Sequence, residues 1–496
     1  MRVAAGDGRR LRAIVLLASV LALDSADLGT LGAVAPELER SFGIGDLEVG
    51  LLASVVSLTA AIATLPVGWL TDRVARVPLL TASIVLWSAA MVACGAAVSF
   101  PMLLITRVFL GAVQATSGPT LASLTGDMFR VRERSRIFGF IHAGELLGAG
   151  FGFLISGEVA AVLSWRWSFW ILALPGFVLA LALWRGLSEP ARGGASRFMH
   201  AELDRDSEEI VHRLVREQRI RPQQDRVLEA DRPALRPLDA IRYLLRIRTN
   251  VYLMVALALG YFFLGGARTF GVIFFSGHYH LGQAAATASA AVLGVGALLG
   301  VLMAGRLADW LLGRGRLAAR VTIGAVGYLA AAALFAPPIA TTDLAIALPL
   351  YVLGAAALTA PSAPLDAAVL DVIPATLWGR AEGVLTALRT LAMAAAPVLF
   401  GVLADGLGGT GAHSFGQGTF GSGTRTGAQG LEVTFLIMLS ALAIAGLVLL
   451  RARSSYPHDV ATAGASDRAT QQPGGRRRNI GRPGVRRRPA PKSLKR

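Results

Sequence analysis

Charged residues are the first thing that this chain is short of. Only 16% of its 496 residues are Asp, Glu, Lys or Arg, whereas a soluble protein of this size carries roughly a quarter. The single cysteine, Cys94, excludes a disulfide framework and a cysteine metal site. Lysine is nearly absent too, because Lys492 and Lys495 are the only two. These shortages argue against an ordinary soluble domain.

Motifs for catalysis and nucleotide binding are also missing. The sequence has no Gly-x-Ser-x-Gly elbow and no His-Glu-x-x-His helix. The Gly-rich stretch 406–430 lacks the Gly-Lys-Ser/Thr ending of a phosphate-binding loop, and its composition indicates a flexible connector on the outer side. We therefore predict that the protein is not an enzyme and that it holds no cofactor and no metal ion.

What the sequence does have is a series of apolar stretches between short charged connectors, as a bilayer core of about 30 Å requires. We expect two sets of six spans. The first set is 13–35, 48–70, 78–98, 102–126, 138–161 and 167–185. The second set is 250–276, 284–308, 318–338, 344–372, 381–405 and 431–451.

These spans predict an all-α membrane protein of about twelve transmembrane helices in two six-helix halves, 1–185 and 249–452. Between them lies a charged linker, 186–248, whose part 199–218 has helix-forming composition and is expected at the cytoplasmic surface. The tail 453–496 is expected to be basic, disordered and cytoplasmic.

The net charge of +16 would suggest nucleic-acid binding in a soluble protein. Here the basic residues lie in connectors that the positive-inside rule places in the cytoplasm, so no nucleic-acid partner is predicted. From Arg476 onward the tail carries basic residues and no acid. It therefore either lies on anionic lipid headgroups or is a solvated tail that sets the orientation.

The N-terminus allows two interpretations. Arg9-Arg10 followed by the apolar run 13–23 resembles a signal peptide. The apolar run resumes after Asp24 and Asp27 and reaches Ala35, which gives a full-length span. We therefore predict a first transmembrane helix, with cleavage as the alternative.

An internal repeat supports the division into halves. One segment, Gly68-Trp69-Leu70-Thr71-Asp72, recurs 305 − 68 = 237 residues later as Gly305-Arg306-Leu307-Ala308-Asp309. A second set recurs with unchanged spacing 371 − 127 = 244 residues later: Asp127, Arg136 and Gly139 correspond to Asp371, Arg380 and Gly383. The halves are therefore predicted to be parallel repeats, with a substrate site between them near mid-membrane.

The connector from Gly68 to Arg76 predicts a conformational latch. Gly68 permits close helix approach, and Asp72 can accept hydrogen bonds from a neighbouring helix N-terminus. Arg73 and Arg76 are expected to join helix ends through ion pairs. The predicted latch residues are Gly68, Asp72, Arg73, Arg76, Asp127, Arg134, Arg136, Gly305 and Asp309.

This connector resembles the signature of the major facilitator superfamily, although Ala75 stands where that family usually has Gly. A narrower resemblance covers about residues 15–190 and rests on Asp27 nine residues before Pro36, Thr106-Arg107, Asp127-x-Phe129 and Arg134-Ser135-Arg136. It is a resemblance to the Spinster-like branch, whose members export lysophospholipids and sphingoid phosphates. That branch typically has Gly-Glu-Ala where this chain has Val113-Gln114-Ala115, and Gln114 cannot titrate. Coupling then falls to Asp27 or another acid, or the protein is a facilitator.

Charged residues inside spans are the candidate site, because each costs ~2.5–3.5 kcal/mol at the bilayer centre and needs a partner or a water-filled cavity. Asp27 and Arg107 are predicted at similar depths. Our hypothesis is that Asp27 is a protonatable switch and Arg107 its counter-charge or an anion anchor. The alternative is a static structural pair.

Further candidates lie in other spans. Asp366 and Arg389 are expected at similar depths in the second half, where they could pair. Glu145 and His142 lie one helical turn apart and could line the cavity, with packing as the alternative role of His142. Arg268 is the candidate to meet a phosphate or carboxylate group. The remaining members of the predicted substrate or proton pathway are Asp24 and Gln114.

The sequence therefore predicts a proton-coupled secondary transporter that moves an amphipathic or lipophilic small molecule, such as a lysophospholipid, by alternating access. A multidrug efflux pump and an organic-anion/proton symporter are alternatives. A non-transporting receptor or scaffold is the alternative of another class. Expected partners are the substrate, protons and membrane lipids. The chain is expected to act as a monomer in the inner (plasma) membrane, with both termini cytoplasmic.

Overall fold

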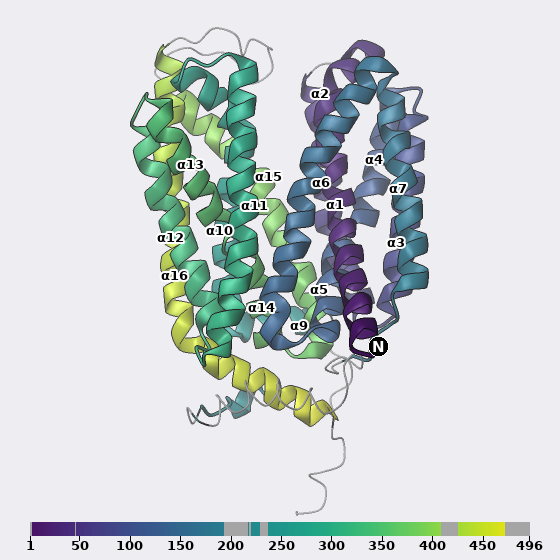
Figure 1. Ribbon diagram of the computed structural model, residues 1–496, viewed down its shortest axis with the longest axis vertical. Helices are drawn as coiled ribbons and strands as arrows, with labels where there is room; N and C mark the ends of the chain where they lie inside the picture. The colour runs from purple at the N-terminus through teal and green to yellow at the C-terminus, as the bar shows by residue number, and fades with distance from the viewer. Residues whose placement is uncertain are drawn as a thin grey trace, which may run out of the picture.

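The computed structural model describes residues 2–44, 46–192, 217, 220–228, 237–407 and 425–471. Within them, twelve helical stretches are long and apolar enough to cross a membrane. Figure 1 shows α1–α7 standing together on one side and α10–α16 on the other. The predicted fold class, an all-α membrane protein of two six-helix halves, is confirmed.

The helices of the first half are α1 (Arg2–Phe42), α2 (Asp46–Thr71), α3 (Arg76–Gly95), α4 (Phe100–Gln114), α5 (Ser117–Met128), α6 (Arg134–Val162) and α7 (Trp165–Gly186). Those of the second half are α10 (Arg248–His278), α11 (Gln283–Gly313), α12 (Ala319–Ile339), α13 (Leu344–Thr359), α14 (Ser362–Val372), α15 (Trp378–Leu407) and α16 (Arg425–Gln471). Shorter elements are η1 (Val131–Glu133), η2 (Gln224–Arg226), α9 (Pro237–Arg246) and η3 (Ala375–Leu377).

The fourth span of each half is interrupted, which the sequence analysis did not predict. The expected span 102–126 consists of α4 and α5, and the expected span 344–372 consists of α13 and α14. A proline lies close after or at each interruption: Pro119 in the first turn of α5, and Pro361 directly before α14. Proline has no backbone N–H to continue the helical ladder, so the helix breaks near it. The pieces after the breaks, α5 and α14, pack between the two halves against α15 and α6 respectively.

The halves meet at the end of the bundle where α1 begins, which we call the lower end (Figure 1). There α2 of the first half packs against α15 of the second, and α6 packs against α11. Away from these contacts, large apolar side chains point outward, among them Ile62, Leu154 and Val178, which are 64%, 64% and 61% exposed. Such apolar outer surfaces suit lipid tails.

The expected disorder of the tail from residue 453 is wrong as far as Gln471. α16 leaves the bundle as a continuous helix and runs beneath its lower end (Figure 1). This extension is held by Tyr456, which donates to Asp371 at 2.5 Å, and by Asp459, which accepts from the backbone N–H of Thr249 at 2.9 Å. Composition alone indicated disorder because it does not register such packing. Residues 472–496 lie outside the described residues.

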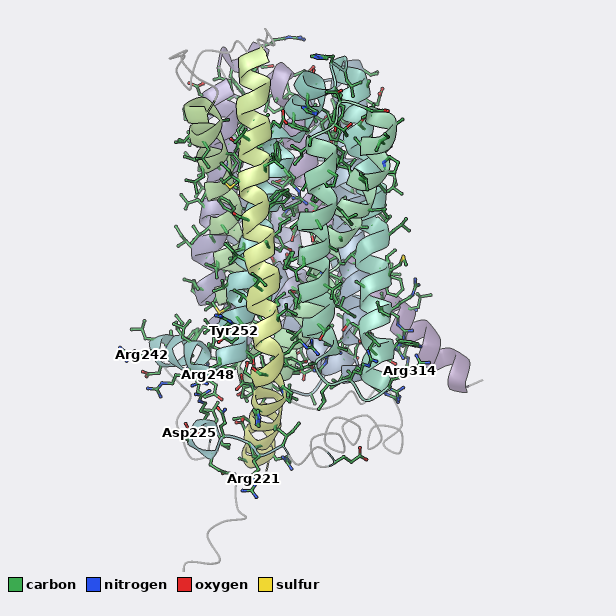
Figure 2. All side chains as sticks on the ribbon, turned by 90° about the vertical axis from the view of Figure 1, so that its left-hand side faces the viewer. Arg221, Asp225, Arg242, Arg248, Tyr252 and Arg314 are labelled. Atoms are coloured by element: carbon green, nitrogen blue, oxygen red, sulfur yellow. The ribbon has the colours of Figure 1, made fainter. Side chains whose placement is uncertain are left out.

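Part of the linker also packs on α16. The backbone N–H groups of Gln223 and Leu228 donate to Thr462 and Ser466, at 3.0 and 3.1 Å. Figure 2 shows the linker residues Arg221 and Asp225 beside this part of α16, and α9 with Arg242 at the side of the bundle. Most of the predicted linker helix 199–218 and most of the Gly-rich connector 406–430 lie outside the described residues.

Candidate functional site

The lower end carries a crossed latch in which each half caps a helix of the other. Asp72, at the end of α2, accepts hydrogen bonds from the backbone N–H groups of Gly379 and Arg380 at the start of α15, at 2.8 and 3.2 Å. In the repeat-related position, Asp309 of α11 accepts from the N–H of Arg136 at the start of α6, at 2.8 Å. A carboxylate at a helix N-terminus is favoured by the helix dipole.

Glycines allow the helices at this latch to touch. A side-chain carbon added to Gly68 would lie 2.6 Å from the carbonyl oxygen of Gly379, and one added to Gly305 would lie 2.5 Å from that of Ser135. Backbone atoms cannot move aside as flexible side chains do. Residues larger than glycine at 68 or 305 would therefore separate the halves here.

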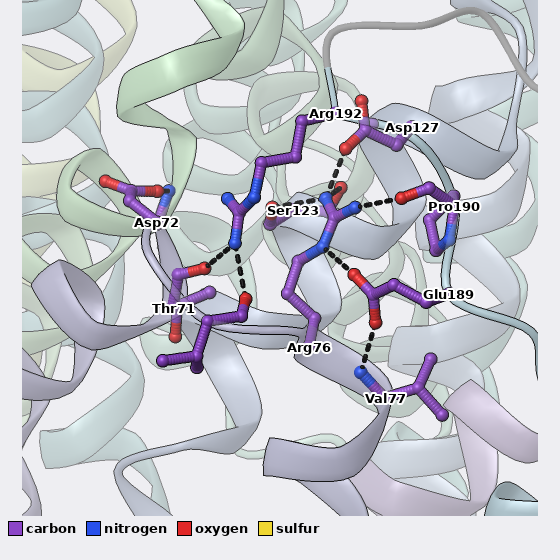
Figure 3. A network of polar contacts seen from close by, with 12 residues as sticks. Thr71, Asp72, Arg76, Val77, Ser123, Asp127, Glu189, Pro190 and Arg192 are labelled. Atoms are coloured by element: carbon purple, nitrogen blue, oxygen red, sulfur yellow. Dashed lines mark hydrogen bonds and ion pairs between the residues drawn. The ribbon is translucent and has the colours of Figure 1, made fainter.

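Arg76 fastens the lower end of the first half, as Figure 3 shows. Its guanidinium forms an ion pair with Asp127 and donates to Glu189 and to the hydroxyl of Ser123, both at 2.9 Å. It also donates to the carbonyl oxygen of Pro190 at 2.8 Å. These contacts tie α3, α5 and the start of the linker together within one half.

The corresponding arginine of the second half reaches across to the first. Arg320 forms an ion pair with Asp371, donates to the hydroxyl of Ser135 at 2.9 Å, and lies 3.3 Å from Asp309. Arg320 and Asp371 are 51 positions apart, as are Arg76 and Asp127. Arg320 was not predicted from the sequence, although it lies 244 residues after Arg76, the offset of the internal repeat.

The other predicted latch residues have different surroundings. Arg134 is buried over the Trp378 ring at 5.0 Å, and its guanidinium lies 3.7 Å from Asp371 of the other half. Arg73 does not join helix ends as expected. It lies at the surface over the ring of Trp69, one turn earlier on α2, at 3.9 Å.

Asp72 is the latch carboxylate that lies outside the membrane-spanning segments. Burial raises the pKa of Asp72 to about 6, while Arg380, the two backbone N–H groups and Arg192 act in the opposite direction. The group can therefore change charge within a pH range that a cell meets.

Higher in the first half, Asp27 and Arg107 form the pair whose similar depth the sequence indicated. One guanidinium nitrogen of Arg107 lies 2.8 and 3.0 Å from the two carboxylate oxygens, and the side chains are 1% and 0% exposed. The guanidinium also lies over Phe169 at 5.0 Å. Its remaining nitrogens, Nε and Nη2, are buried without hydrogen-bond partners among the described residues.

A cavity of about 390 Å³ lies between α6 and the second half. Its wall is mostly apolar, and eight aromatic side chains contribute to it: Tyr261, Phe263, Phe274, Phe275, Tyr328, Phe335, Tyr351 and Phe435. Three predicted site residues line it, namely His142, Glu145 and Arg268. Asp27 and Arg107 are not among the lining residues, so the hypothesis that Arg107 anchors an anion in this cavity is not supported.

His142 and Glu145, on the cavity wall, belong to a cluster of ionisable residues of which most are buried. His142 of α6 lies between Asp366 of α14, at 2.8 Å, and Glu145 of its own helix, at 3.0 Å. Arg389 of α15 pairs with Asp366 and lies 3.3 Å from Glu382. The structure thus brings four predicted residues together and adds Glu382, which the sequence analysis missed.

Two further candidates, Asp24 and Gln114, each have a buried polar atom without a hydrogen bond among the described residues, namely Asp24 Oδ1 and Gln114 Nε2. Neither residue is among those that line the cavity.

The comparisons with known proteins agree with this geometry. The family model described as Major Facilitator Superfamily matches residues 17–397. Protein spinster homolog 1 of Homo sapiens is 28% identical over 201 residues, which are 40% of this chain and 37% of the human protein. The probable L-galactonate transporter of Escherichia coli (strain K12) is 28% identical over 169 residues, 34% of this chain and 37% of that protein. The matches therefore span little more than a third of these relatives.

Two solved structures show the same fold. A bacterial homolog of the human lysosomal transporter Spinster, inward-facing and unoccupied, has a TM-score of 0.57 at 20% identity, covering 91% of this chain and 98% of that chain. The transporter FucP in the outward conformation has a TM-score of 0.64 at 12% identity. The match covers 89% of this chain and 98% of the FucP chain. Because the family model covers well over half of the sequence, the chain belongs to the Major Facilitator Superfamily, within which it resembles the Spinster-like branch.

Proposed function

We propose that this protein is a secondary transporter that moves an amphipathic or lipophilic small molecule by alternating access, coupled to protons. The observation that carries this proposal is the aromatic-walled cavity of about 390 Å³ beside the interface of the halves. An apolar wall with a few convergent polar groups suits a ligand with an apolar body and a small polar head, such as a lysophospholipid.

The latch supports alternating access. Backbone caps at Asp72 and Asp309, and the hydrogen bond from Arg320 to Ser135, join the halves at the lower end. Such contacts can be exchanged for water when that end opens, so the two halves could rock about the cavity as rigid bodies. The structure then represents the state in which the lower end is closed.

The charge of the connectors supports an orientation. Arginines gather at the lower end, where Arg73, Arg132, Arg192 and Arg314 lie in or beside the connectors. By the positive-inside rule we place this end in the cytoplasm, together with both termini and the basic tail. We further propose that the chain acts as a monomer in the inner (plasma) membrane and that its tail lies against anionic lipids.

Proton coupling is assigned to Asp27. A proton on its carboxylate would remove the ion pair that holds Arg107, a buried cation with two nitrogens already without partners. Because the pair does not line the cavity, it would act on the packing of α1 and α4 rather than on the substrate.

One observation favours a second candidate, an organic-anion symporter. Arg268 is exposed where it lines the cavity, and among the described residues no acid lies within ion-pair distance of it. Its guanidinium could receive a carboxylate or phosphate. The relative named as a probable L-galactonate transporter fits this candidate.

A thermal-shift screen separates these candidates, because ligands that bind the native state raise its melting temperature. The purified protein is heated with lysophospholipid below its micelle concentration, with lipophilic cations, or with soluble organic anions. We expect lysophospholipid to raise the Tm. Stabilisation by soluble anions alone would replace the lipid proposal with the anion symporter, and no stabilisation by any class would favour a receptor or scaffold.

A matched pair of glycine variants tests whether the ligand occupies this cavity. Both Gly294 and Gly150 lie in helices and have open space where a side chain would be added, but only Gly294 lines the cavity. Gly294→Leu should abolish the ligand-induced rise in Tm, and Gly150→Leu should preserve it. Equal rises in the two variants would place the ligand elsewhere.

A further inference from the structure

A polar bridge joins the two halves below the cavity, and it is separate from the Asp27–Arg107 pair. His142 of the first half uses one ring nitrogen toward Asp366 of the second half, at 2.8 Å, and the other toward Glu145, at 3.0 Å. The side chains of His142 and Asp366 are 11% and 6% exposed. The link is therefore shielded from solvent on both sides of the interface.

The geometry requires one extra proton. A neutral imidazole has a single N–H, so it can donate to only one of two carboxylates, and its other nitrogen would then face an oxygen with no hydrogen between them. Both contacts are satisfied when the ring is doubly protonated. An imidazolium between two carboxylates is also a charge-assisted arrangement, which gives stronger hydrogen bonds than neutral partners do.

The charged residues around the bridge also favour a protonated His142. From α14 and α15 come Asp366, Glu382 and Arg389, which form ion pairs with one another. From α10 come Tyr261, whose ring lies under Arg389 at 5.4 Å, and Arg268, which interacts electrostatically with Glu145.

From α1, Asp24 also lies in the electrostatic neighbourhood of Glu145. No described residue of α5, α7 or α11 is paired with His142. Among the residues in direct contact, the carboxylates of Glu145, Asp366 and Glu382 outnumber the single guanidinium group of Arg389. Uncompensated charge in a membrane interior is unfavourable, so a proton on His142 reduces the excess of negative charge.

The bridge also lies where it can control opening. His142 is eight residues into α6, about 12 Å from the start of the helix at 1.5 Å per residue. Between the two, Gly139 packs against Val301 and Arg136 takes part in the latch. The bridge therefore lies between the latch and the cavity, and a rocking motion that opens the lower end must separate His142 from Asp366.

Building on the proposed alternating-access function, we propose that His142 is a second proton-binding residue, which ties the halves together under the cavity when it is protonated. Loss of its proton leaves Asp366 without this partner and adds repulsion between the carboxylates. The lower end then opens more readily. Protonation should accordingly favour the closed lower end, and deprotonation the open one.

The test measures the opening of the lower end directly and needs no substrate. Nitroxide labels are placed on cysteines introduced at Ala75 and Thr376, exposed positions on opposite halves near the Asp72 latch. The native Cys94 is fully buried and should stay unlabelled. Distances between the labels are recorded in the full chain from about pH 6.5 to about pH 10.5, above the pKa of about 6 of buried Asp72, so that Asp72 is ionised in most molecules throughout.

The parent protein and three variants are compared, and each is expected to respond to pH in its own way. In the parent, the population with long distances should grow as the pH rises. His142→Gln should lose this pH dependence, and His142→Lys, which keeps a cation, should stay closed at the highest pH. His280→Gln replaces an exposed histidine and should behave like the parent. An unchanged pH response in His142→Gln, or a His142→Lys protein that opens as the parent does, would overturn the proposal.

If His142→Gln does not fold, the His142→Lys result and the equivalent Asp366→Asn variant decide the question. Asp366→Asn should weaken the same pH response, because it removes the carboxylate that His142 contacts across the interface. Failure of the proposed transport function would be seen separately, as absence of substrate flux while the distances still respond to pH. The two ideas can therefore fail independently.

Discussion

The contact between Gly68 and Gly379 offers a sharp test of the closed lower end. Gly68→Ala adds one carbon 2.6 Å from the carbonyl oxygen of Gly379, whereas ordinary contact begins near 3.4 Å, so the helices must move apart by about 3.4 − 2.6 = 0.8 Å. Overpacking of this kind costs about 1–3 kcal/mol. Because the open state does not have the contact, the equilibrium ratio of open to closed molecules should rise about 5-fold to 150-fold.

The assay is alkylation of a buried reporter. Thr64 is fully buried, lies one turn above Gly68, and contacts the second half at Gly383. A cysteine introduced there reacts with a maleimide only when the halves part, so its reaction rate follows the open fraction.

Gly50→Ala is the matched control, because it lies on the same helix with nothing within 4 Å of the added carbon. Both substitutions gain similar helix propensity, about 1 kcal/mol. Equal labelling rates in the two variants would refute the steric latch.

Three further outcomes are expected. Asp27→Asn should abolish uptake driven by a pH gradient but preserve substrate exchange in the absence of a gradient. If gradient-driven uptake stays intact, the Asp27–Arg107 pair has only a structural role. Ending the chain after Arg453 removes the lower part of α16 and should lower the Tm, whereas ending it after Gln471 should not, and thermal unfolding distinguishes the two. Burial raises the pKa of Asp72 to about 6 from an ordinary value near 4, so the closed end binds a proton that the open end releases. Acidification from about pH 6 to about pH 4 should therefore favour closure in the spin-label assay, and Asp72→Asn should remove that response.

The architecture could be predicted because a bilayer leaves few choices. Apolar run lengths gave the twelve spans, and the offsets of 237 and 244 residues gave the two halves. The same repeat identified Asp72 and Asp309, whose caps are equivalent in the structure. Applied to Arg76, it would also have given Arg320, a residue with no other distinguishing signal in its own segment.

The site could be predicted only in part, because depth along a helix is readable from sequence and rotation about its axis is not. Similar depth in the membrane predicted that Asp27 could pair with Arg107 and Asp366 with Arg389, and both ion pairs form. The contact of His142 with Asp366 depends on how the halves dock, which no spacing within one half encodes. The helical tail was missed for a similar reason, since buried Tyr456 and the capping Asp459 stabilise it through tertiary contacts.

Substrate flux is the measurement that tests the central claim most directly. The full chain is reconstituted into vesicles loaded with buffer of one pH and diluted into another, and uptake of labelled lysophospholipid is followed with and without the gradient. Protein-dependent uptake that a pH gradient drives above equilibrium, and that Gly294→Leu blocks while Gly150→Leu does not, is the expected result. Absence of protein-dependent flux for lysophospholipids, lipophilic cations and organic anions under any imposed gradient would contradict transport itself.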